Sequence, residues 1–110
     1  MDVYQTVARV TVPKNHSFSF SDSTADIRFD TKLDNMNFTE LTNDTSFGIT
    51  QNESNANLIV WDEHEQEVTD EYFIKRDDNI VLIKHVMPAM LTLDEKIIRQ
   101  DCLCYLMTRL

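Results

Sequence analysis

The residues that could act as nucleophiles are two cysteines near the C-terminal end of the sequence. Cys102 and Cys104 are the only cysteines, and a partner base would have to be His85 or His16. Because both thiols lie in the most apolar tract, burial disfavours the thiolate that nucleophilic attack requires. Their spacing strains a mutual disulfide, and two cysteines supply only half of a tetrahedral zinc site. We interpret them as buried core thiols and predict no catalytic residue.

A second group that could take part in catalysis or metal binding is the acidic run of residues 62–71, DEHEQEVTDE, which holds six acids and no base. General acid–base catalysis needs a carboxyl group whose pKa is raised by burial or by a close neighbour, whereas a dense acidic run repels itself and stays solvated. His64 could join Asp62 or Glu67 around a divalent cation, but the run contains no glycine for an EF-hand turn and no HExxH spacing. We predict a protruding loop, with no metal site and no cofactor.

The overall charge and the scarcity of glycine argue against nucleic acids and nucleotides as partners. The chain carries 19 acidic and 10 basic residues, for a net charge of −9, whereas binding to phosphate backbones is driven by Lys and Arg. Gly48 is the only glycine, so no glycine-rich loop can bring backbone N–H groups to a phosphate. Phe18 and Phe20 could stack on bases, but their neighbours are not basic, and we assign both rings to a core or sheet face.

The elements that must position these residues are predicted to be β-strands of one domain, residues 1–110. The chain is 42% hydrophobic, which is typical of a globular protein. Alternating or short apolar runs between polar turns indicate strands. We expect the strand at 58–61, apolar on both faces, to be central in its sheet, and residues 72–86 to form the clearest hairpin around a connection at 76–79. The predicted strands are 4–12, 16–21, 25–30, 36–41, 47–50, 58–61, 72–75 and 80–86.

The C-terminal residues allow two interpretations. The spacing of Thr92 and Glu95 matches a capping box, which allows a helix over residues 93–110. The second half of such a helix would be apolar on all sides, and a small domain cannot bury it. We prefer a short helical turn that ends near Lys96, followed by a strand over residues 100–108. The predicted fold class is therefore all-β, an antiparallel β-sandwich with one short helical turn near the C-terminus.

Two stretches of the sequence carry a family resemblance. Phe29, Thr31 and the Asp34-Asn35 turn end one strand before the next apolar segment, and the apolar strand from Ile80 runs into Pro88 before a helical turn and a last strand. Across residues 15–110 this order resembles the N-terminal domain of phage baseplate upper proteins. The chain lacks the glycines that the family has after its central strand and before its last strand. The resemblance implies a β-sandwich that anchors a baseplate or fibre protein to the tail, with no catalytic residues to carry over.

We therefore expect a structural, non-catalytic phage tail or baseplate assembly module, made in the host cytoplasm and located in the virion. Its partners would be other tail or baseplate subunits and further copies of itself, because strands near both termini would leave sheet edges open to pairing. Nucleic acid is not an expected partner, because the chain is acidic. A membrane is not an expected partner either, since no stretch approaches the ~18 apolar residues of a membrane span.

Two other functions stay open from the sequence. The alternative is a small acidic inhibitor that binds a nucleic-acid-processing protein by mimicking phosphate charge. The third is an enzyme, which would need Cys104, His85 and a carboxylate within hydrogen-bond reach of one another.

Overall fold

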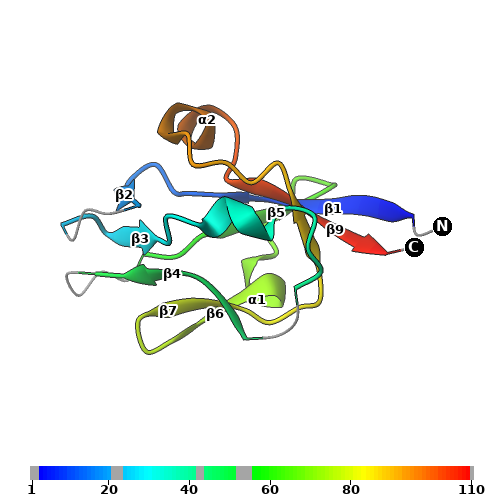
Figure 1. The fold of residues 1–110 in the computed structure, drawn as a ribbon, viewed down its shortest axis with the longest axis horizontal. Coiled ribbons are helices and arrows are strands. Elements are labelled where there is room, and N and C mark those ends of the chain that lie inside the picture. The colour runs from blue at the N-terminus through cyan, green and yellow to red at the C-terminus, as the bar shows by residue number, and fades with distance from the viewer. Residues whose placement is uncertain (1–2, 21–23, 42–43, 52–55, 110) are drawn as a thin grey trace.

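Two β-sheets packed against each other form the structure, a computed structural model that describes residues 3–20, 24–41, 44–51 and 56–109 (Figure 1). The four-stranded sheet has the order β5 (Ile59–Asp62), β1 (Tyr4–Thr11), β9 (Cys104–Arg109) and β8 (Met87–Ala89). The five-stranded sheet has the order β2 (Phe18–Ser19), β3 (Ile27–Phe29), β4 (Thr45–Thr50), β7 (Asn79–Leu82) and β6 (Phe73–Arg76). The all-β class is confirmed.

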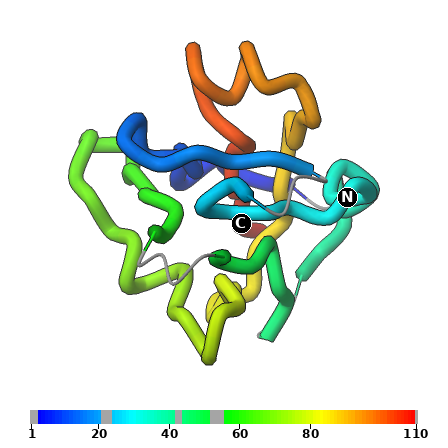
Figure 2. Tube along the Cα trace, turned by 90° about the vertical axis from the view of Figure 1, so that its left-hand side faces the viewer, coloured from blue at the N-terminus to red at the C-terminus, as the bar shows by residue number. Residues whose placement is uncertain are grey.

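Three short helical segments in the described residues connect or cover the sheets. They are the 3-10 helix η1 (Leu33–Met36) and the α-helices α1 (Thr69–Tyr72) and α2 (Glu95–Gln100). Figure 2, which looks along the long axis, shows the orange α2 at the top and the yellow-green β6–β7 hairpin at the bottom, so these two elements lie on opposite sides of the molecule. Within the described ranges, no helix has the length and apolar character needed to cross a bilayer.

The strands near the two chain ends lie side by side at the centre of the four-stranded sheet (Figure 1). β1 pairs antiparallel with β9, with Val10 opposite Cys104, and a bulge interrupts the ladder between Thr6 and Ala8. The expectation that the terminal strands are sheet edges was therefore wrong. Self-association stays a prediction, but edge pairing of the terminal strands no longer supports it.

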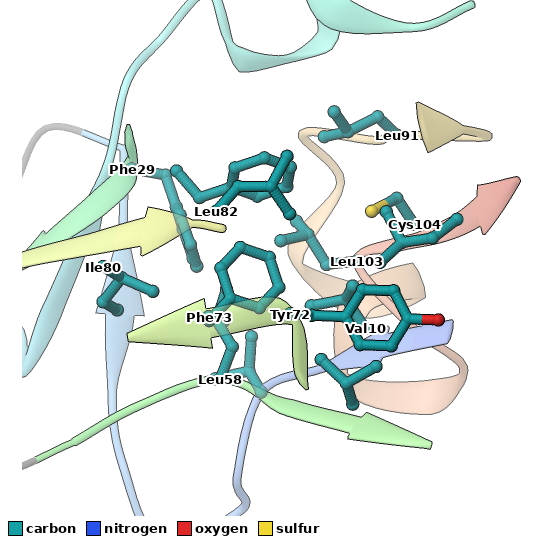
Figure 3. Packing of buried hydrophobic residues seen from close by; sticks show 14 of the residues in the cluster. Val10, Phe29, Leu58, Tyr72, Phe73, Ile80, Leu82, Leu91, Leu103 and Cys104 are labelled. Carbon is teal, nitrogen blue, oxygen red and sulfur yellow. The ribbon is translucent and has the colours of Figure 1, made fainter. Parts of the chain in front are cut away.

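One hydrophobic core fills the space between the sheets. Every second residue of β1 from Ala8 onward is buried, as the alternation in the sequence predicts. Figure 3 shows Phe73 and Leu82 from the five-stranded sheet and Val10 and Cys104 from the four-stranded sheet as parts of one cluster. The rings of Phe47 and Phe73 meet edge to face, 5.0 Å apart between their centroids.

The predicted strand over residues 36–41 was wrong. Residues 33–36 form η1, and the chain then follows the outer edge of β8, where the Phe38 N–H donates to the Pro88 carbonyl at 2.8 Å and Leu41 pairs with Val86. The cause is local, because Asp and Asn side chains offer the backbone alternatives to a ladder. Asp30, for example, accepts a hydrogen bond from the Lys32 N–H at 2.7 Å.

Two predictions about strand position also need correction. β5 is an edge strand and not a central one, and residues 66–69 cover its outer side: the Val60 N–H donates to the Thr69 hydroxyl at 3.0 Å and the Asp62 N–H to the Gln66 carbonyl at 2.9 Å. The strand from Ile80 does not run on to Pro88, because β7 ends at Leu82 and Pro88 lies within a separate strand, β8, where an edge position tolerates its missing N–H.

The preferred interpretation of the C-terminal segment, a helical turn and then a strand, is confirmed with shifted bounds. α2 continues to Gln100, and β9 begins at Cys104. The capping box was wrong, because Asp94 is the N-cap and accepts from the Lys96 N–H at 2.9 Å. The predicted hairpin at 72–86 is also confirmed as β6–β7, although β7 ends at Leu82. The sandwich is antiparallel except for β2 and β3, which run parallel.

Candidate functional site

The two cysteines lie where the sequence places them, in the core. Both are free and buried, and burial raises the pKa of the Cys104 thiol far above its ordinary value. Burial, together with the Asp101 carboxylate, also raises the pKa of Cys102. A thiol with a raised pKa carries little thiolate near neutral pH and is a weak nucleophile.

The two histidines named as partner bases contact carboxylates instead. His85 Nε2 lies 3.6 Å from Glu40 Oε2, and His16 Nδ1 lies 3.4 Å from Asp26 Oδ2. Glu40 also accepts from the Tyr4 hydroxyl at 2.8 Å and from Arg109 at 2.5 Å, and the hydrogen bond from Tyr4 is the main cause that lowers the Glu40 pKa. This polar cluster closes one end of the four-stranded sheet, where β1 and β9 come together.

The protruding loop predicted for the acidic run is only partly confirmed: residues 63–65 form an exposed turn, but Glu67 pairs with Trp61 of β5 and the run ends in α1, which begins at Thr69. Asp62, the last residue of β5, organises the turn. Asp62 Oδ1 accepts from the His64 N–H at 2.8 Å and from the Gln66 N–H at 2.9 Å, and the hydrogen bond from Gln66 is the main cause that lowers the Asp62 pKa. Glu65 pairs with Arg9 at 2.6 Å. In the described part of the chain, no three His, Cys, Asp or Glu side chains are grouped to hold a metal ion.

Phe18 and Phe20 pack against another aromatic ring of the same chain, that of Phe29. Their ring centroids lie 6.0 and 5.6 Å from that of Phe29. The Arg99 guanidinium of α2 stacks over the Phe18 ring at 4.6 Å and donates to the carbonyls of Pro13 and His16. The rings and this arginine therefore connect α2 to β2, an edge strand of the five-stranded sheet.

The sequence did not predict an apolar groove next to α2. The groove lies between this helix and two segments that border β8, residues 37–38 and residues 90–92. Within the described ranges four large hydrophobic side chains are exposed, and three of them line this groove: Phe38 (64% exposed), Met90 (69%) and Ile97 (46%). The fourth, Val3, lies elsewhere. The groove has a volume of about 350 Å³, and its floor includes Leu91, Cys102 and Tyr105. We name these residues, with Asn37, Thr92 and Asp101, the α2–β8 groove.

Two of the exposed groove residues have a strained backbone. Phe38 has φ 59° and Met90 has φ 57°, the left-handed region that bulky side chains rarely adopt. Such strain costs about 1–3 kcal/mol per residue and persists only where surrounding contacts enforce it.

The contacts that enforce this backbone come mainly from Asn37. Its side chain donates to the Leu91 carbonyl at 2.8 Å and accepts from the Leu91 N–H at 2.6 Å, as a neighbouring strand would. The bond from the Phe38 N–H to Pro88 fixes the same crossing. The two segments are thereby locked with Phe38 and Met90 facing outward, where neither contributes to the core.

Comparison of the chain with protein-family models, with curated proteins and with solved structures finds no match.

Proposed function

We propose that this protein is a non-catalytic assembly module that works through protein–protein contacts, and that the α2–β8 groove is its contact site. The observation that carries the proposal is the gathering of three exposed large hydrophobic side chains in one groove. Contiguous apolar surface on a small protein marks an interaction site, whereas single exposed hydrophobic residues are normal.

The backbone of the groove supports the same proposal. Because Phe38 and Met90 lie outside the core, polar residues could replace them at no cost to core packing, and neither residue needs positive φ for the sake of the core. Instead, the fold holds both residues at positive φ with hydrogen bonds from Asn37. Strain that is maintained away from the core is characteristic of functional surfaces.

The setting that we propose is the tail or baseplate of a phage virion, on the strength of the sequence resemblance, with other tail subunits as partners. A compact β-sandwich with a preformed contact site suits a part that is added to a large particle without changing shape. The acidic turn supports the alternative function, an inhibitor that mimics phosphate charge, less well. Glu65 forms an ion pair with Arg9, and Asp62 accepts hydrogen bonds from backbone N–H groups of its own turn.

Photo-crosslinking in the native particle tests this function. A benzophenone amino acid replaces Phe38 in one variant and Val3 in a control variant, since both positions are exposed but only the first lies in the groove. We expect the chain in purified tails, with a crosslink from position 38 to a second tail protein, identified by mass spectrometry. Absence of the chain from purified virions, or equal crosslinking from positions 3 and 38, would overturn the proposal.

A further inference from the structure

We propose that the α2–β8 groove binds an apolar peptide segment flanked by lysine or arginine, supplied by a partner protein. This inference rests on the proposed function and specifies the chemistry of the partner. It depends on three features of the groove: the charge on its rim, the state of the neighbouring sheet edge, and the fixed positions of its apolar side chains.

The charge on the rim is acidic. Asp101 is exposed and lines the groove, and the described lining contains no basic residue. Asp101 lies one helical turn after Ile97, and its N–H donates to the Ile97 carbonyl at 2.8 Å. An apolar side chain with a cationic one beside it is therefore the complement of Ile97 and Asp101.

The basic residues of α2 do not neutralise this rim. Arg99 is directed away from the groove, because its guanidinium donates to the carbonyls of Pro13 and His16 and covers the Phe18 ring. Lys96 does not line the groove. A bound lysine or arginine would therefore meet Asp101 without competition from a basic side chain in the lining.

A second copy of this chain is a poor occupant. Each copy carries a net charge of −9, so a symmetric contact would bring two acidic rims together, and like charges across an interface are unfavourable. A partner with basic residues gains from the same field, because opposite charge steers association. Charge complementarity thus favours a different protein over self-association at this site.

Addition of a strand to β8 is also excluded as the binding mode. The outer side of β8 is already taken by residues 37–41 through Phe38, Leu41 and the side chain of Asn37. A partner must therefore bind through side chains that enter the groove. A volume of about 350 Å³ is at the lower end of the ~300–1,000 Å³ of ligand sites, which suits a few apolar side chains of a peptide.

Three synthetic peptides test the inference. The first has a leucine-rich core flanked by lysines, the second has the same core flanked by glutamates, and the third keeps the lysines and replaces leucine with serine. Binding is followed through the ¹³C-methyl NMR signals of Met90 and Ile97 at about 0.15 M salt. We expect the first peptide to shift these signals and to bind at least about tenfold more tightly than either of the others.

Two variants locate the binding and its charge preference. Met90→Asn keeps a residue that tolerates positive φ and removes the apolar side chain, so it should weaken the first peptide about tenfold or more, whereas the control Val3→Thr should change nothing. Asp101→Asn should reduce the preference for lysine over glutamate flanks. Circular dichroism of each variant verifies that the fold is retained.

Several outcomes would overturn the inference. They are equal binding of the lysine-flanked and glutamate-flanked peptides, no binding of any peptide at millimolar concentration, binding unaffected by Met90→Asn, and a Met90-dependent dimer in sedimentation. The proposed function is judged separately, because a crosslink from position 38 to a tail protein would support it even if the peptides failed.

Discussion

At the scale of single residues, Phe38 and Met90 show how a surface site can be maintained against local preference. Positive φ is costly for both side chains. Asn37 offsets this cost by pairing with both backbone polar groups of Leu91, a residue 54 positions away in the sequence. Nothing about an asparagine in a polar segment signals such a partner. The sequence predicts a strand over residues 36–41, whereas in the structure the Asn37 side chain holds this segment to Leu91.

Asp62 gives a prediction about the acid stability of the acidic turn. Hydrogen bonds from the Gln66 and His64 N–H groups lower its pKa below the ordinary 3.8. A carboxylate with a lowered folded-state pKa stabilises the fold above its ordinary pKa, and this contribution is lost as the pH falls through the folded-state pKa. Asp62→Asn should therefore be less stable than wild type at about pH 7, and the difference should shrink as the pH falls from about 5 to below 3.8.

Urea unfolding followed by the fluorescence of Trp61 across this pH range checks the prediction. The Asp62→Asn variant should itself still lose some stability in acid, because hydrogen bonds from Ser17 and Tyr4 lower the pKa values of Asp26 and Glu40. Asp70→Asn, at an exposed position of the same run, is the matched control. A constant gap between wild type and Asp62→Asn at all pH values would show that the carboxylate charge is irrelevant.

At the scale of elements, Gly48 is required in β4 by space and not by its φ angle. A Cβ atom at this position would lie 2.9 Å from the Arg28 carbonyl oxygen and 3.0 Å from Phe29 Cδ1 on the neighbouring β3. The backbone oxygen cannot yield without moving the strand. Gly48→Ala should therefore destabilise the protein by about 1–3 kcal/mol, which is typical of overpacking.

Chemical denaturation measures this cost. Ser46→Ala, two residues earlier in the same strand and exposed, serves as control and should stay within about 0.5 kcal/mol of wild type. A Gly48→Ala variant that is no less stable than Ser46→Ala would contradict the contact with β3 as the reason for the glycine.

The strands that the sequence predicts best are those with a clear period of two or a bounded apolar run. β1, β4 and the β6–β7 hairpin follow from such patterns. The 36–41 segment has apolar residues at similar intervals, yet local Asp and Asn hydrogen bonds direct it into η1 and then along β8. The apolar run of β5 wrongly indicated a central strand, because residues 66–69 cover the edge that another strand would have covered.

The α2–β8 groove could not be predicted from the sequence for a related reason. Its exposed residues come from three separated segments, and no pattern around Phe38, Met90 or Ile97 distinguishes them from core residues. Their outward orientation depends on the positive φ angles and on contacts between residues far apart in the chain. The cysteines were easier, because an unbroken apolar tract indicates burial by itself.

At the scale of the whole molecule, the placement of the terminal strands determines how the fold is held together. β1 and β9 are the first and last strands, and they form the middle pair of one sheet. The four-stranded sheet therefore forms only when β1 and β9 pair with each other. Its inner face is completed by residues of the other sheet, since the buried apolar side chains form one cluster that includes Val10, Leu106, Phe47 and Ile80.

This arrangement predicts that the two sheets unfold together. Trp61 in β5 reports on the four-stranded sheet by fluorescence, and the ¹³C-methyl signal of Ile80 in β7 reports on the five-stranded sheet. Because the two inner faces share one core, neither sheet can lose its partner without exposing its own buried residues, so the two urea midpoints should coincide. Gly48→Ala acts in the five-stranded sheet, yet it should lower both midpoints equally. A variant that lowers the Ile80 midpoint and leaves that of Trp61 in place would show that each sheet is stable without the other.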